Sequence, residues 1–189
     1  MNSSESVGKH CAPKKQVLFV LLDQFADWEA APLASAINQS AGWRVRVVAP
    51  DKTPVRSLGG LTVMPDMAVA EALESDFAGV ILIGGLSWRT EVANVVGPLA
   101  RLAVDRQAVL GAICDATVFL GALGLLNETP HTGNILDDLK AYAGERYSGE
   151  AHYRQEPALR SGNLVTANGT VPMDFAREVL AALGVMTGE

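Results

Sequence analysis

A single cysteine directly after an apolar stretch is the residue whose setting points most clearly to chemistry. Residues 109–113 predict a buried strand, Cys114 comes next, and a helix of small and apolar residues is expected over 117–125. The chain leaves no room for a loop, which is the strand–turn–helix pattern of a nucleophile elbow. Because such a turn is strained, we expect a positive φ at Cys114. The pattern alone leaves open a buried cysteine that only fills core space.

The rest of the chain alternates between apolar runs that predict strands and helical apolar spacing. Strands are expected over residues 17–22, 44–49, 79–83, 109–113 and 163–167, with two short ones between Pro54 and Pro65. Helices are expected over residues 27–40, 69–73, 95–105, 117–125, 135–142 and 172–183. This alternation predicts an α/β fold, a three-layer α/β/α sandwich with a mainly parallel central sheet. We expect a flexible tail over residues 1–14 and a single domain over residues 15–189.

Composition and charge exclude several classes of partner. Fifteen Lys and Arg against 21 Asp and Glu give a net charge of −6, and no basic block is present. We therefore expect no binding to nucleic acid or to an anionic membrane surface. No apolar run approaches the roughly 20 residues of a spanning helix, and no signal peptide is expected. The two cysteines, Cys11 and Cys114, predict neither a disulfide framework nor a zinc site, so we expect a cytoplasmic protein.

Four segments of the chain together resemble the ThiJ/PfpI superfamily, also written DJ-one/PfpI. They are VLFVLLDQFADWEAAPL (17–33), VILIGG (80–85), AICDAT (112–117) followed by GALGLLN, and NLVTANGTVPMDFAREVLAAL (163–183). The resemblance extends over roughly residues 16–184 and rests on the order and spacing of all four segments. It implies the class I glutamine-amidotransferase-like, or flavodoxin-like, version of the α/β sandwich.

The resemblance also assigns roles to two side chains. Cys114 falls on the family's reactive cysteine, and Glu29 on the acidic residue that hydrogen-bonds its sulfur. A protonated Glu29 would donate to the thiolate and move a proton during reaction. That hydrogen bond and the positive end of the following helix lead us to expect that Cys114 titrates below a free thiol. Without the resemblance, a helix first-turn carboxylate is the preferred explanation of Glu29.

Further candidates surround this pair. The N–H groups of Gly85 and Asp115 would form an oxyanion hole beside the elbow, although glycines also end many strands as simple turns. The Asp115 carboxylate opposes thiolate formation, and it acts either at the pocket rim or as a first-turn carboxylate. His131 lies where relatives often have a histidine that reaches the cysteine, with a loop hydrogen bond as the alternative.

Trp88 and Thr117 are the candidates for contact with a substrate. Trp88 follows the Gly84-Gly85 turn and would wall the pocket, or serve as a dimer contact or a loop anchor. Thr117 is on the helix after the elbow. The three histidines show no metal-binding spacing, and Gly59-Gly60 does not precede a helix, so we expect no metal and no bound cofactor.

These observations predict a cysteine-nucleophile enzyme that acts on a small molecule without a cofactor. The family supports two chemistries of this kind: hydrolysis of an amide-type bond, and hydration or isomerisation of a reactive carbonyl such as a 2-oxoaldehyde. The alternative is an oxidative-stress protein in which Cys114 is a redox-sensing thiol. The resemblance further implies a homodimer.

Overall fold

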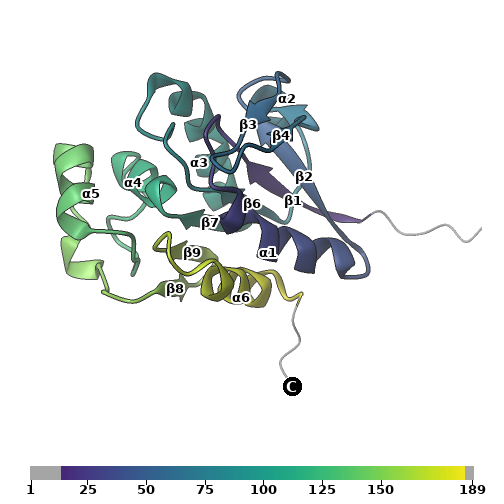
Figure 1. The fold of residues 1–189 in the computed structure, drawn as a ribbon. Coiled ribbons are helices and arrows are strands. Elements are labelled where there is room, and N and C mark those ends of the chain that lie inside the picture. The colour runs from purple at the N-terminus through teal and green to yellow at the C-terminus, as the bar shows by residue number, and fades with distance from the viewer. Residues whose placement is uncertain (1–13, 186–189) are drawn as a thin grey trace, which may run out of the picture.

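Seven strands form the central sheet of the structure, a computed structural model that describes residues 14–185 (Figure 1). The strand order is β5-β2-β1-β6-β7-β9-β8, and every neighbouring pair is parallel except β8 with β9. The strands are β1 (Lys15–Val20), β2 (Trp43–Ala49), β5 (Met67–Ala68), β6 (Gly79–Leu82), β7 (Val109–Ile113), β8 (Ala158–Ser161) and β9 (Leu164–Ala167). Cys11 and nearly all of the expected N-terminal tail lie outside the described residues.

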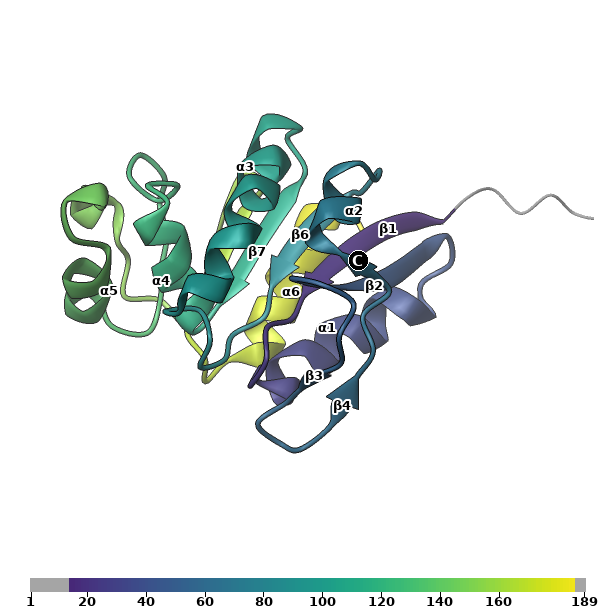
Figure 2. The same cartoon turned by 90° about the horizontal axis from the view of Figure 1, so that it is seen from above.

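The helices cover both faces of this sheet. Helices α1 and α6 pack together on one face, and α2, α3 and α4 lie on the other, with α5 packed on the outer side of α4 (Figures 1 and 2). Their bounds are α1 (Asp27–Gln39), α2 (Val69–Leu73), α3 (Gly97–Asp105), α4 (Asp115–Ala122), α5 (Leu136–Ala143) and α6 (Pro172–Leu183). The expected three-layer α/β/α sandwich is therefore confirmed.

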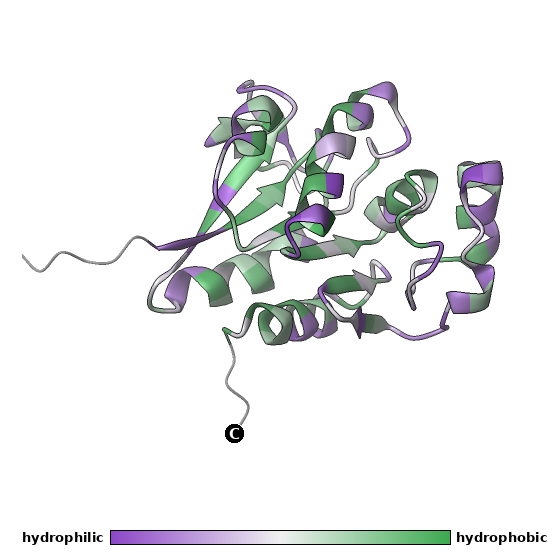
Figure 3. Ribbon diagram, turned by 180° about the vertical axis from the view of Figure 1, so that it is seen from behind, coloured by the Kyte–Doolittle hydropathy of each residue, from purple (hydrophilic) through white to green (hydrophobic). Residues whose placement is uncertain are grey.

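Strand β1 shows why the apolar runs of the sequence are continuous rather than alternating. Val17 and Phe19 enter the core beneath α1 and α6, whereas Leu18 and Val20 enter the core beneath α2, α3 and α4. All four are essentially inaccessible to solvent. A strand covered on both faces needs apolar side chains at every position. Figure 3 shows the consequence, with hydrophobic colour concentrated in the central strands and polar colour on outer helix turns.

The sheet brings the ends of three central strands to one edge. The chain moves outward from β1 to β2 and β5 and then returns to the other side of β1 with β6 and β7, so the strand order reverses between β1 and β6. Apart from the two-residue edge strand β5, the parallel strands follow the flavodoxin-like order, in which ligands bind at the carboxyl ends of the strands next to the reversal. The segments after β1, β6 and β7 carry Glu29, Gly84-Gly85 and Cys114 respectively. The topology therefore places the sequence candidates from three separate segments at one edge.

The structure corrects the expected boundaries in several places. The helix expected over 95–105 begins as a 3₁₀ turn, Glu91–Val96, and becomes α-helical only at Gly97, where Pro98 occupies the first turn. The edge strands β5 and β8 were not expected, because their short sequences lack a clear apolar pattern. The two short strands around Gly59-Gly60 are confirmed as an antiparallel pair, β3 (Val55–Arg56) and β4 (Thr62–Val63).

Candidate active site

Cys114 occupies a strained turn between β7 and α4. Its backbone has φ 60° and ψ −129°, a conformation that residues with a Cβ rarely adopt, which confirms the predicted positive φ. The Cys114 N–H donates to the carbonyl of Ala167 at 3.0 Å, and the Cys114 carbonyl accepts from the Thr117 N–H at 3.1 Å. The Thr117 hydroxyl donates to the same carbonyl at 2.7 Å. The neighbouring strand and the first helical turn thus hold the cysteine in place.

Glu29 reaches this turn from the first turn of α1 and is 1% exposed. Its Oε2 accepts a hydrogen bond from the Gly84 N–H at 2.9 Å. Its Oε1 has no hydrogen-bond partner of standard geometry among residues 14–185, and the Cys114 thiol is the side chain that interacts with this carboxyl. Burial raises the pKa of Glu29 to about 7, against the lowering effect of its hydrogen bonds with Cys114 and Gly84. Glu29 can therefore give or take a proton near neutral pH.

Burial also raises the pKa of the Cys114 thiol above its ordinary value, and the negative charge of Glu29 raises it further. Hydrogen bonds from the Asn134 side chain and the Asp115 backbone N–H lower it, but they do not outweigh burial. The expectation that Cys114 titrates below a free thiol is therefore wrong for this structure. The thiol is therefore mainly protonated at neutral pH, and the Glu29 carboxyl is the titratable group beside it.

Two glycines allow the thiol and the carboxyl to approach so closely. A Cβ on Gly84 would lie 2.6 Å from the Cys114 Cβ and would also collide with Glu29 Oε2. A Cβ on Gly169, in the turn after β9, would lie 2.8 Å from the Cys114 Sγ and 3.0 Å from Glu29 Oε1. The sequence analysis did not single out Gly169. Both positions need a residue without a side chain because the reactive pair occupies that space.

The backbone N–H groups of Gly85 and Asp115 lie next to the same pair. Gly85 lines the cavity that contains Cys114, and no described carbonyl or side chain accepts its N–H. The Asp115 N–H points to the Cys114 sulfur. A Cβ on Gly85 would lie 2.5 Å from the Gln24 carbonyl oxygen, so the close crossing of these two loops requires glycine. The two amides are available to an oxyanion at this place.

The Asp115 side chain does not stand alone beside the thiol. Arg89 forms a two-pronged pair with it, with Nε donating to Oδ2 at 2.8 Å. The same guanidinium binds Asp138 and lies over the ring of Tyr142 at 5.5 Å. These two carboxylates raise the pKa of Arg89 further above its ordinary value. Arg89 therefore balances the charge that was expected to oppose the thiolate, and no pattern in the sequence indicated this partner.

A cavity of about 470 Å³ opens onto the sulfur. Its polar lining comes from the reactive pair, Asp115 with its partner Arg89, and Asn134. Its outer lining is apolar, with Trp28 50% exposed, Leu58 43% exposed and Leu86 63% exposed. These exposed apolar side chains therefore line the same cavity as the thiol.

Two candidates lie away from this cavity. His131 is fully buried, its Nδ1 hydrogen-bonds the Thr129 carbonyl at 2.7 Å, and its Nε2 accepts from the Tyr147 hydroxyl at 2.8 Å. Trp88 is 1% exposed, donates to the Ile83 carbonyl at 2.6 Å, and packs against Phe119. The structure does not bring either side chain to the sulfur, because both rings are held in the core by local partners.

Thr117 stabilises the backbone of the Cys114 turn and does not line the cavity. It is completely buried, and its hydroxyl is occupied by the Cys114 carbonyl. The residue that does contact the sulfur is Asn134, which the sequence analysis missed. Its Nδ2 lies 3.4 Å from the Cys114 Sγ. Asn134 lies three residues after His131. The resemblance therefore indicated the correct loop, but the side chain that contacts the sulfur is Asn134 and not His131.

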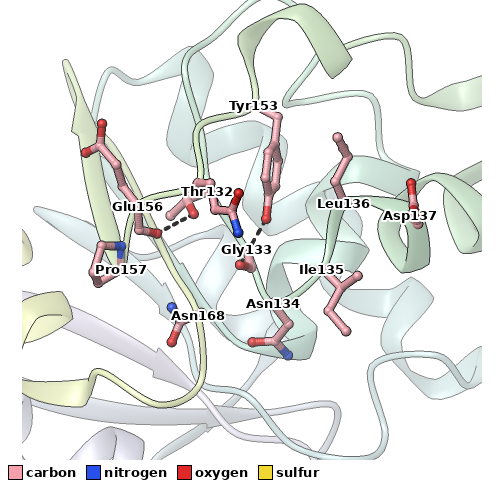
Figure 4. A pocket seen from close by; sticks show the side chains of 11 residues that line it. Thr132, Gly133, Asn134, Ile135, Leu136, Asp137, Tyr153, Glu156, Pro157 and Asn168 are labelled. Carbon is pink, nitrogen blue, oxygen red and sulfur yellow. Dashed lines mark hydrogen bonds between the residues drawn. The ribbon is translucent and has the colours of Figure 1, made fainter.

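A second cavity of about 710 Å³ adjoins the site at Asn134 (Figure 4). It is bounded by the loop 132–137, by the segment 153–157 and by Asn168. The side chain of Asn134 belongs to the linings of both cavities. Asn134 therefore lies where the cavity that contains Cys114 meets the second cavity.

Comparison with known proteins assigns the family. The model of the DJ-1/PfpI family matches residues 15–182, and this chain belongs to that family. It is 38% identical over 176 residues to "Uncharacterized protease YdeA" of Bacillus subtilis, covering 93% of this chain and 86% of that protein. It is 22% identical over 174 residues to "Glutathione-independent glyoxalase DJR-1.2" of Caenorhabditis elegans, covering 91% of this chain and 90% of that protein.

A solved structure agrees with this assignment. The crystal structure of the DJ-1 superfamily protein Atu0886 from Agrobacterium tumefaciens matches with a TM-score of 0.85 and 40% identity, covering 91% of each chain. Between Lys14 and Val185, no helix is long and apolar enough to cross a membrane. Over the same residues, no group of three or more His, Cys, Asp or Glu side chains is placed to hold a metal ion.

Proposed function

We propose that this chain is a cofactor-free cysteine enzyme in which the Cys114 sulfur adds to the carbonyl carbon of a small uncharged molecule. The observation that carries the proposal is the buried Glu29 carboxyl beside the thiol, with its pKa raised to about 7. A general base is most effective when its pKa is close to the working pH. One relative is named a protease and the other a glyoxalase. A protease acts at the carbonyl carbon of an amide, and a glyoxalase acts on a 2-oxoaldehyde, so both names are consistent with attack on a carbonyl carbon.

The residues of the site supply each step. The Glu29 carboxylate takes the thiol proton as the sulfur bonds to the carbonyl carbon, and the carbonyl oxygen gains the negative charge. The N–H groups of Gly85 and Asp115 stabilise that oxyanion. Protonated Glu29 then returns its proton to the adduct. One carboxyl thus serves first as base and then as acid.

The site favours a reactive carbonyl over a peptide bond. Among the described residues that line the cavity there is no imidazole, the group that most often protonates a departing amine in cysteine proteases. A 2-oxoaldehyde needs no leaving group. Its sulfur adduct, a hemithioacetal, becomes a thioester when Glu29 moves a proton from the former aldehyde carbon to the adjacent carbonyl carbon. The hydroxyl proton on the former aldehyde oxygen passes to the oxygen of that adjacent carbon, so the adduct is isomerised without an external oxidant or reductant. Water then hydrolyses the thioester to a 2-hydroxy acid and frees Cys114.

The test is a substrate panel of 2-oxoaldehydes with small apolar substituents and of peptide p-nitroanilides. We expect wild-type protein to form the 2-hydroxy acid and Cys11→Ser, as the control thiol variant, to do the same. Cys114→Ser and Glu29→Gln should lower the rate at least about 100-fold, the usual range for a lost acid–base group. Cys114-dependent cleavage of the anilides without 2-oxoaldehyde turnover would instead establish amide hydrolysis. Turnover of neither class would contradict the proposal.

The redox alternative ranks second because peroxide attacks the thiolate, and burial raises the pKa of Cys114. Its support would be two oxygen atoms added at Cys114 by substoichiometric peroxide, measured by intact mass, in a protein that turns over no substrate of the panel. Rapid turnover would remove the reason to propose it.

We also propose that the chain forms a homodimer. The support is the apolar group of Trp28, Leu58 and Leu86 on the surface. Trp88, which was expected to add to that surface, is buried and does not. Light scattering that gives the 19.9 kDa of one chain at micromolar concentration would contradict a dimer.

A further inference from the structure

The amide of Asn134 contacts the Cys114 sulfur in a fixed orientation. Its Oδ1 accepts a hydrogen bond from the Gly169 N–H at 2.8 Å, and its Nδ2 lies 3.4 Å from the Cys114 Sγ. A backbone N–H can only donate, so the oxygen of the amide must face Gly169 and the NH₂ group must face the sulfur. Asn134 therefore offers the sulfur a donor and cannot offer it an acceptor.

The backbone on the N-terminal side of Asn134 is held by three hydrogen bonds, one of them buried and two partly buried. The Thr132 N–H donates to the Thr166 hydroxyl of β9 at 2.8 Å, and the Thr132 hydroxyl donates to the Glu156 carbonyl at 2.6 Å. The Tyr153 hydroxyl donates to the Gly133 carbonyl at 3.2 Å, and Figure 4 shows its ring pointing down to that carbonyl. The loop is thus anchored to two other segments just before it presents the amide. Asn134 is preorganised rather than drawn in by the sulfur.

We propose that Asn134 is a catalytic residue that stabilises the ionised Cys114 sulfur by donating a hydrogen bond to it, and so directs the thiol proton to Glu29. The inference deepens the proposed function and rests on it for its catalytic meaning. A neutral amide does not take up a proton at working pH. Glu29 is then the only group with a described contact to the sulfur that can carry the proton. The proton leaves Sγ for Glu29 Oε1, and the negative charge left on the sulfur faces the Asn134 N–H.

The charged groups around the sulfur agree with this assignment. The negative charge of Glu29 opposes the thiolate from one side, and Asp115 is paired with Arg89. The side-chain donor is Asn134, and its hydrogen bond is the largest of the effects that lower the pKa of Cys114. Among the described side chains, Asn134 donates to this sulfur without itself titrating, whereas Glu29 becomes a donor only after it has taken up the proton.

The test measures the pH dependence of Cys114 alkylation by iodoacetamide, in the absence of substrate and with Cys11→Ser in every protein. A hydrogen bond to a charged group corresponds to about 1–2 pKa units, so Asn134→Ala should raise the pKa of Cys114 by about that much. Asn134→Asp should raise it at least as far, because a carboxylate near the sulfur adds a like charge. Turnover of the best substrate should fall with both changes.

Asn127→Ala is the matched control. The Asn127 amide clamps a loop in the same manner, accepting from the Ser148 N–H at 2.9 Å and donating to the Arg146 carbonyl at 3.1 Å, in a loop that does not line the Cys114 cavity. Its removal should leave the alkylation profile unchanged. If loss of any such loop contact changed the site, the alkylation profiles of Asn134→Ala and Asn127→Ala would both shift.

An unmoved Cys114 pKa in folded Asn134→Ala would overturn the inference. If that variant does not fold, wild-type protein labelled with ¹⁵N provides the second measurement: the side-chain N–H signals of Asn134 must shift with the same midpoint as thiolate formation, and a constant signal overturns it. Because neither measurement uses a substrate, a shifted pKa without any turnover would contradict the proposed function alone.

Discussion

Two clusters of buried titratable groups differ in how the hydrogen-bonding capacity of their polar atoms is satisfied. In the first, the two nitrogens of His131 bind Thr129 and Tyr147. In the second, Glu29 Oε1 has no hydrogen-bond partner of standard geometry among residues 14–185 and belongs to a carboxyl that interacts with the Cys114 thiol. A cavity opens onto the second cluster and exposes it to an incoming molecule. A buried polar group with all its partners stabilises the fold, whereas one that lacks a partner beside a cavity is available for chemistry.

Burial shifts the two clusters in opposite directions. It raises the pKa of Glu29 to about 7 and lowers the pKa of His131, because it favours the neutral form of each group. Stability must therefore depend on pH with opposite slopes at the two places. The pH dependence of stability therefore tests whether Glu29 and His131 differ as the structure indicates.

The largest expected effect concerns Glu29 and the pH dependence of stability. The folded pKa of about 7 lies above the unfolded value of 4.5, so the folded protein holds more protons between these values. The free energy of unfolding contributed by Glu29 is then highest below pH 4.5 and is lost as pH rises through 7. Between pH 5 and 8 the loss should be about 2–3 kcal/mol.

The measurement is urea unfolding of wild type and Glu29→Gln across this range. Glutamine does not titrate, so the difference between the two proteins isolates Glu29 from the opposing slope of His131. If the difference does not change with pH, Glu29 is not held protonated by burial, and its assignment as the acid–base group fails.

The next effect concerns the space around the sulfur. Gly169→Ala would place a methyl group 2.8 Å from the Cys114 Sγ and 3.0 Å from Glu29 Oε1. We expect alkylation of Cys114 and turnover to fall about 10- to 100-fold, since overpacking of this kind costs about 1–3 kcal/mol. Gly97→Ala is the control, because its new Cβ would meet only Leu123 Cδ2, at 3.4 Å. Equal rates in the two variants would show that the pair is less tightly enclosed than the structure indicates.

The same contrast explains which parts of the site the sequence predicted. The strand, the cysteine and the helix of the elbow are adjacent in the chain, so their local pattern sufficed. Glu29 lies 85 positions before Cys114 and was found only through the family resemblance. Once the parallel sheet was predicted, the carboxyl ends of its strands brought these segments together.

The residues that sequence reasoning missed come from loops. Asn134, Gly169 and Arg89 contact the site because of where the chain turns, and no local pattern distinguishes them from other loop residues. His131 attracted attention because imidazole is the usual partner of a catalytic cysteine. Its residue type suggested chemistry, but its position three residues earlier in the loop directs the ring into the core.

The smallest expected effect is that of removing the His131 imidazole. His131→Phe keeps a ring of similar size between Tyr147 and Tyr153, whose centroids lie 5.6 and 5.7 Å away, and removes both hydrogen bonds. The free energy of unfolding should fall by about 1–2 kcal/mol, because the buried Tyr147 hydroxyl and the Thr129 carbonyl lose their partner. The alkylation profile of Cys114 should stay unchanged in the folded protein. The double variant with Tyr147→Phe should be no less stable than His131→Phe, since no hydroxyl is then left unpaired. If His131→Phe instead abolishes turnover at full stability, the imidazole takes part in the reaction, and the contrast between the two clusters fails.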